Sequence, residues 1–164
     1  MTGLERCMTV LEGGVADRVP VVPQAFLFAA RTAGYKIGQI CKDAVKLAKS
    51  HVICQEKYGY DGCVIDVDDA TLAEACGAKC IYREDEVVAT DEHHPLLDSV
   101  KAYKDLELPD PLKDGRLPVW LEATERLVSE IGDHVFIMGR ADQGPFDLAC
   151  LLRGTQNFMM DLIT

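Results

Sequence analysis

A short apolar run followed at once by acidic residues is the feature that most constrains how this chain can fold. Residues 63–65 read Cys-Val-Ile, which is typical of a strand that is buried on both faces of a parallel sheet. Asp66, Asp68 and Asp69 follow directly. Ligands of α/β folds bind at the carboxyl ends of the parallel strands, so the pattern predicts a site at this point. A solvated loop or a helix cap is the alternative interpretation, because Asp is a common N-cap residue.

Two further segments predict strands of the same sheet. Residues 19–23 are an apolar, β-prone run that two prolines restrict to a short strand, and residues 134–138 are a third buried strand. Apolar side chains recur at steps of three and four over residues 39–58 and again from Pro118 to residue 131, which predicts two long helices, each ended by a glycine. The order of strand, helix and strand favours an α/β fold with parallel strands.

Shorter elements complete this prediction. Residues 4–11 favour a first helix, and a last apolar helix begins near Pro145. Residues 79–83 and 86–90 predict a β-hairpin outside the main sheet, and residues 91–116 a polar loop with one short helix near 98–104.

Three parallel strands do not complete such a sheet, and the apolar segment 158–163 at the end of the sequence indicates unfinished burial. A (β/α)8 barrel of the TIM type requires about 250 residues. We therefore expect residues 1–164 to form one partial domain, the amino-terminal part of a (β/α)8 barrel. Such a part would pair with the missing barrel half or with itself.

Charge and cysteine content exclude several classes of partner. The 164 residues carry a net charge of -10, which argues against nucleic acid and anionic membrane surfaces, because both are bound through basic patches. No segment is long and apolar enough to span a bilayer, and we expect a cytoplasmic protein. The seven cysteines lie mostly within apolar patterns and predict reduced thiols. Cys76 and Cys80 could meet a structural zinc, but no second close Cys pair or suitably spaced His accompanies them.

Three motifs follow one another along the chain: residues 5–13 with 17–21, Tyr60-Asp61-Gly62 leading into residues 66–68, and Gly139 with residues 144–149. Together they resemble the uroporphyrinogen decarboxylase superfamily. Members are (β/α)8 barrels that include the porphyrinogen decarboxylases and the corrinoid-linked methyltransferases. The resemblance covers the whole chain but only the first portion of such a barrel. It implies that Asp68 matches the central catalytic aspartate of the decarboxylases, which binds pyrrole nitrogens and stabilises a protonated intermediate.

Departures from the decarboxylase pattern favour the methyltransferase branch. The arginine-rich segment that follows the first strand in the decarboxylases is replaced by residues 24–30, which contain no arginine, and Leu151 stands where the decarboxylases place a tyrosine. An octacarboxylate substrate needs those guanidinium groups. The resemblance therefore implies a methyltransferase that moves a methyl group between a small substrate and a corrinoid (cobalamin) protein. Zinc and the corrinoid would serve the complete enzyme, and the zinc ligands of the family lie beyond this portion.

The candidate site residues stand at the predicted strand ends. Asp68 is the predicted catalytic residue, Asp66 either contacts substrate or braces a loop, and Asp69 is a cap. The predicted substrate-binding residues are Gln24, Asp66, Arg140, Asp142 and Gln143, with a structural Arg140–Asp142 ion pair as the alternative for two of them.

Three histidines receive structural interpretations, and two other functions stay open. His51 lies on an apolar helix face and predicts a core histidine, whereas His93 and His94 favour a solvated loop. The first alternative function is a cofactor-independent uroporphyrinogen decarboxylase of tetrapyrrole biosynthesis that relies on Asp68. The second is a non-catalytic half-barrel that acts as an interaction module.

Overall fold

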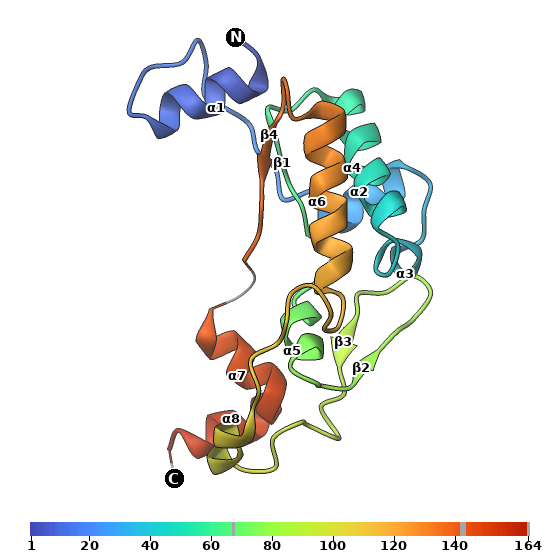
Figure 1. The fold of residues 1–164 in the computed structure, drawn as a ribbon, viewed down its shortest axis with the longest axis vertical. Coiled ribbons are helices and arrows are strands. Elements are labelled where there is room, and N and C mark those ends of the chain that lie inside the picture. The colour runs from blue at the N-terminus through green and yellow to red at the C-terminus, as the bar shows by residue number, and fades with distance from the viewer. Residues whose placement is uncertain (67, 142–143, 164) are drawn as a thin grey trace. The chain divides into compact units, whose positions relative to one another are not determined.

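The computed structural model describes residues 1–66, 68–141 and 144–163, which separate into two compact units. Unit 1 comprises Met1–Val67 and Val119–Arg140, and unit 2 comprises Asp68–Pro118 and Ala141–Thr164. Figure 1 shows the elements of both units. The boundary between the units thus falls within the acidic segment that follows residues 63–65, with Asp66 in unit 1 and Asp68 and Asp69 in unit 2, and the chain returns to unit 1 at the long helix near position 119.

Two of the three predicted parallel strands are confirmed, and both lie in unit 1. Strand β1 (Gly62–Val64) pairs in parallel with β4 (Phe136–Met138), with Gly62 opposite Phe136 and Val64 opposite Met138. The strand predicted at residues 19–23 is wrong, because this segment forms no regular strand. Two prolines remove the N–H groups that a ladder needs, although the carbonyl of Val21 still accepts a 2.8 Å hydrogen bond from the amide of Asp61.

Close approach of the two strands requires glycine at position 62. An added Cβ would lie 2.8 Å from the carbonyl oxygen of Phe136, so Gly62→Ala is expected to push β1 away from β4 and to lower the free energy of unfolding by about 1–3 kcal/mol. Urea denaturation measures the loss. Gly139→Ala is the matched control, since its Cβ would meet no described atom within 4 Å. Equal stability of the two variants would contradict the close approach.

The helices of unit 1 follow from local capping signals as well as from periodicity. Helix α1 (Gly3–Leu11) begins with a capping box between Thr2 and Glu5. Helices α2 (Phe26–Thr32), α3 (Ile37–Ile40), α4 (Ala44–Tyr58) and α6 (Leu117–Ile131) follow. Helix α1 contacts β4, and α4 contacts β1 and α2.

The helix predicted over residues 39–58 is confirmed for residues 44–58, but its start is wrong, because the chain breaks the helix at residues 41–43. Asp43 has extended backbone, and its carboxylate accepts a 2.9 Å hydrogen bond from the amide of Lys46, so it caps the start of α4. Gly59 ends α4 in the left-handed conformation, with φ of 65°, as its position predicted.

His51 on α4 is a core histidine, as predicted. The residue is 0% exposed, and neither ring nitrogen has a hydrogen-bond partner among the described residues. Burial lowers the pKa of His51 to about 4, because the surroundings disfavour the charged ring. The imidazole is therefore neutral in the folded chain at neutral pH.

Unit 2 consists of short elements around a small core. Helix α5 (Thr71–Ala75) precedes the predicted hairpin, confirmed as the antiparallel pair of β2 (Cys80–Ile81) and β3 (Ala89–Thr90). The core side chains are Ala73, Ala78, Leu97 and Leu152. A 3-10 helix (Val100–Asp105) and helices α7 (Pro145–Arg153) and α8 (Thr155–Asp161) complete the unit.

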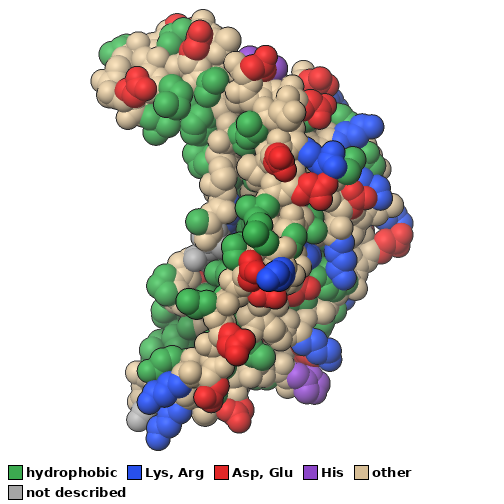
Figure 2. Space-filling view, viewed as in Figure 1, with side chains coloured by type: hydrophobic (Ala, Val, Ile, Leu, Met, Phe, Trp, Pro, Cys, Tyr) green, Lys and Arg blue, Asp and Glu red, His purple; other side chains and the backbone are tan. Residues whose placement is uncertain are grey.

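Large apolar side chains stay exposed on the last two helices of unit 2. Figure 2 shows hydrophobic groups gathered over α7 and α8, and the exposed residues of these helices include Phe146, Met159 and Met160. No helix in the described part of the chain is long and apolar enough to cross a membrane.

Candidate functional site

The carboxyl ends of β1 and β4 bring two predicted site residues together in unit 1. Asp66 follows β1 by two residues and is 0% exposed, and Arg140 follows β4 by two residues. Because the strands are parallel and in register, both side chains reach the same edge, where the Arg140 guanidinium forms an ion pair with the Asp66 carboxylate. The guanidinium carbon also lies 5.7 Å from the ring centroid of Phe26. This pairing orients a cation at the strand ends.

The structure does not place the other three predicted substrate-binding residues, Gln24, Asp142 and Gln143, beside the Asp66–Arg140 pair. Gln24 is exposed in the loop before α2. Asp142 and Gln143 lie outside the described residues, and so does the alternative Arg140–Asp142 ion pair. The carboxylate that does pair with Arg140 is Asp66.

Asp68, the predicted catalytic residue, is buried in unit 2 and held by Arg116. Two guanidinium nitrogens of Arg116 donate to the two carboxylate oxygens, with Nη1–Oδ2 of 2.5 Å and Nη2–Oδ1 of 2.9 Å. Oδ1 also accepts from the amide of Ala70 at 3.0 Å and from the hydroxyl of Thr71 at 3.3 Å. Asp68 thus closes the turn that leads into α5, in addition to any role at the strand ends.

Arg116 is a residue that the sequence reasoning missed. Its Nε donates to Glu74 at 2.5 Å, the hydroxyl of Tyr82 donates to the same carboxylate, and the guanidinium lies over the Tyr82 ring at 5.4 Å. Burial alone would lower the pKa of Arg116, but the hydrogen bonds and charges of Asp68 and Glu74 raise it above its ordinary value, so the side chain stays charged. The one sequence feature that could have drawn attention to Arg116 is its position directly before an apolar helix.

A second buried carboxylate lies at the opposite end of β1. Asp61 precedes the strand and accepts from Arg6 at 2.5 Å, from Arg18 at 2.6 and 2.8 Å, and from the amide of Val21 at 2.8 Å. Burial would raise the pKa of Asp61, but these hydrogen bonds, with the charges of both arginines, lower it overall. Because this cluster joins α1, the loop after it and β1 at the amino end of the strand, we assign it to stability.

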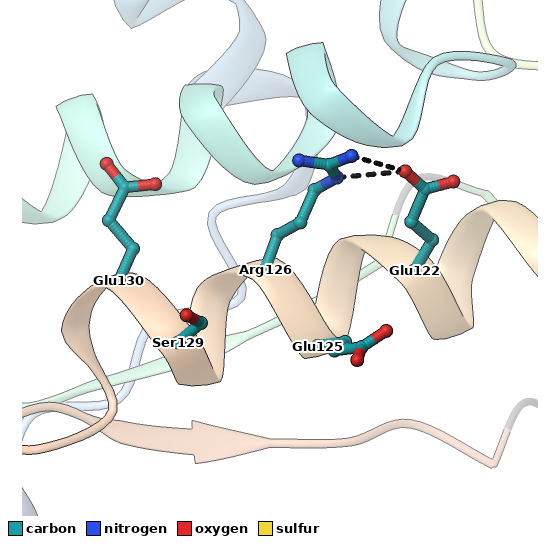
Figure 3. Close-up of a pocket in the computed structure, with 5 residues that line it drawn as sticks. All are labelled: Glu122, Glu125, Arg126, Ser129 and Glu130. Atoms are coloured by element: carbon teal, nitrogen blue, oxygen red, sulfur yellow. Dashed lines mark hydrogen bonds and ion pairs between the residues drawn. The ribbon is translucent and has the colours of Figure 1, made fainter.

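Surface hollows are found in both units. The larger, of about 820 Å³, lies on the outer face of α6 and is lined by Glu122, Glu125, Arg126, Ser129 and Glu130 (Figure 3). It contains none of the predicted site residues. A hollow of about 420 Å³ in unit 2 is lined by Asp69 and Ala70 together with the hairpin and Leu151.

Metal ligands are not clustered in the described part of the chain. No group of three or more His, Cys, Asp and Glu side chains has a metal-binding arrangement there. In the part of the chain that the structure describes, Cys76 and Cys80 are reduced and form no disulfide.

Comparison with known proteins gives a structural relative and a family. A search of curated proteins found no match. A solved structure described as a methyltransferase from Methanosarcina mazei matches with a TM-score of 0.82 and 24% identity, over 98% of this chain and 48% of that chain. The chain therefore spans about half the length of that structure and has its fold over that half. The family model of uroporphyrinogen decarboxylase (URO-D) matches residues 2–164, and the chain belongs to this family.

Proposed function

We propose that this chain is the amino-terminal half of a (β/α)8 barrel methyltransferase of the uroporphyrinogen decarboxylase family. The enzyme would move a methyl group between a small substrate and a corrinoid (cobalamin) protein in the cytoplasm. The observation that carries the proposal is the fold match of nearly the whole chain to half of a methyltransferase. The missing half of the barrel, or a second copy of this chain, would close the sheet beyond β4.

The pair of Asp66 and Arg140 supports a substrate-orienting role at the barrel mouth. The Arg140 side chain is 17% exposed, so one face of a charged group reaches the surface, while Asp66 and Phe26 fix its position. A guanidinium held in this way donates hydrogen bonds in a fixed direction to an acceptor on the substrate. Gln24, Asp142 and Gln143 remain proposed substrate contacts.

Zinc and the corrinoid would act through other parts of the complete enzyme. The described residues offer no set of donors for zinc, so zinc would be held by the remaining barrel, where it would lower the pKa of a bound thiol. The corrinoid would arrive on its partner protein.

The decarboxylase alternative receives less support. Its reaction needs Asp68 as an acceptor for pyrrole N–H groups, but both oxygens of Asp68 already accept hydrogen bonds from Arg116. Residues 24–30 also lack the arginines that an octacarboxylate requires.

A methyl-transfer assay on the natural gene product that contains residues 1–164 tests this function. We expect methylcobalamin to lose its absorbance in the presence of a small thiol and catalytic amounts of the protein. Asp66→Asn is expected to reduce kcat/KM by about 100-fold, because Arg140 loses the charge that orients it. Glu122→Gln on the outer face of α6 is the matched control and should retain full activity.

Other outcomes of the assay would favour one of the two alternative functions. Turnover of uroporphyrinogen without loss of methylcobalamin would identify a decarboxylase. A folded gene product that turns over neither compound would favour the interaction module.

A further inference from the structure

We propose that Arg116 is a positioning residue that fixes the carboxylate of Asp68 and, through it, the turn at residues 68–71. The importance of this turn to substrate rests on the proposed function, but its dependence on Arg116 does not.

The geometry of the guanidinium carries the inference. The Arg116 side chain is 3% exposed. Its Nη1 and Nη2 donate hydrogen bonds to Asp68, and its Nε donates to Glu74. These partners are 48 and 42 residues away in sequence, so one side chain joins the loop before α6 to the turn before α5 and to α5 itself. The Tyr82 ring packs against the guanidinium and its hydroxyl bonds to Glu74, which fixes the second carboxylate as well.

Asp68 transmits this constraint to the backbone. The oxygen that accepts from Nη2 of Arg116 also accepts from the amide of Ala70 and the hydroxyl of Thr71. Asp69 and Ala70, in the middle of the turn, line the 420 Å³ hollow of unit 2. A carboxylate held at both oxygens therefore sets the position of one wall of that hollow.

Lysine cannot replace arginine in this arrangement. Two parallel N–H groups match the two oxygens of Asp68 while a third points to Glu74, and this planar fork is specific to guanidinium. An ammonium group keeps the charge but concentrates its donors at one point. Arg116→Lys thus separates the loss of geometry from the loss of charge.

Amide hydrogen exchange of the natural gene product, read by NMR, tests the proposal. In Arg116→Lys we expect the Ala70 amide to exchange at least about tenfold faster, because the acceptor of its hydrogen bond is no longer held. The Leu97 amide, which donates to the carbonyl of Leu152 in the core of unit 2, should keep its rate. Arg83→Lys is the matched control, since Arg83 pairs with Glu86 at the surface of the same unit, and it should change neither rate.

The outcomes are distinct from those of a merely structural role. Equal acceleration at Ala70 and Leu97 would mean general loss of stability and would overturn the proposal, as would an unchanged Ala70 rate. If Arg116→Lys does not fold, NMR of the unsubstituted protein still tests the proposal. The Nε–Hε group of Arg116 should be rigid, and a mobile Nε–Hε group would overturn the proposal.

Enzymatic activity gives an independent test of the role of Arg116. In the methyl-transfer assay, Arg116→Lys should lower kcat and leave KM nearly unchanged, whereas an equal kcat would contradict a catalytic role of Asp68 that depends on Arg116. If the unsubstituted protein transfers no methyl group, the proposed function fails, while the exchange rates still decide the role of Arg116.

Discussion

Asp61→Ala is expected to lower the free energy of unfolding by about 3–5 kcal/mol, the largest loss for any single change considered. Asp61 is 3% exposed and neutralises two arginines from different segments, Arg6 on α1 and Arg18 in the following loop. Its removal leaves the buried Arg6 guanidinium with Asp17 as its remaining carboxylate partner and leaves the amide of Val21 without its acceptor. Urea denaturation followed by circular dichroism measures the change.

Glu122→Ala is the matched control for this variant. Glu122 also accepts two hydrogen bonds from an arginine, Arg126 at 2.7 and 2.9 Å, but on the exposed face of α6. Surface pairs of this kind contribute about 0.3–0.5 kcal/mol. If the two variants were equally stable, burial of the Asp61 cluster would have no energetic consequence and its assignment to stability would be wrong.

Acidification from pH 6.5 to pH 4 is expected to remove up to about 3 kcal/mol of stability through His51 alone. Burial lowers the pKa of His51 from its ordinary value of 6.5 to about 4 in the folded chain. Between these two values the unfolded chain binds a proton that the folded chain does not, so stability is full above pH 6.5 and falls as the pH falls. Carboxylates with lowered pKa, such as Asp61 and Asp43, lose their contributions only at lower pH.

The test compares unfolding at several pH values in two leucine variants. His51→Leu fills nearly the same volume without a titrating group, so the decline between pH 6.5 and pH 4 should become shallow. His93→Leu removes an exposed imidazole from unit 2 and should leave the decline in place. An unchanged decline in His51→Leu would place the acid sensitivity in another group.

Local sequence patterns predicted those parts of the fold that depend on neighbouring residues. The parallel strands at β1 and β4, the hairpin of unit 2 and the start of α7 at Pro145 each have a signal within a few positions. Two local predictions differed from the structure where signals competed. Apolar periodicity runs through residues 41–43, but the Asp43 cap begins a new helix there, and the prolines of residues 19–23 prevent a regular ladder.

The candidate site was predictable only where one rule of topology fixed the contact. Parallel strands end at the same edge, so Asp66 and Arg140 could be expected to meet. Arg116 has no such rule, because its partnership with Asp68 depends on how a loop before α6 folds back on α5. The periodicity and turn signals used for the strands and helices do not predict a contact over 48 residues.

The pairing of Gly62 with Phe136 also has a consequence for the order of folding during synthesis. Every residue between β1 and β4 must leave the ribosome before the two strands can pair, and closing so long a loop is slow. Until then the nascent strand presents open hydrogen-bonding groups to any other chain nearby. Early chaperone binding at this point would protect the newborn polypeptide from aggregation.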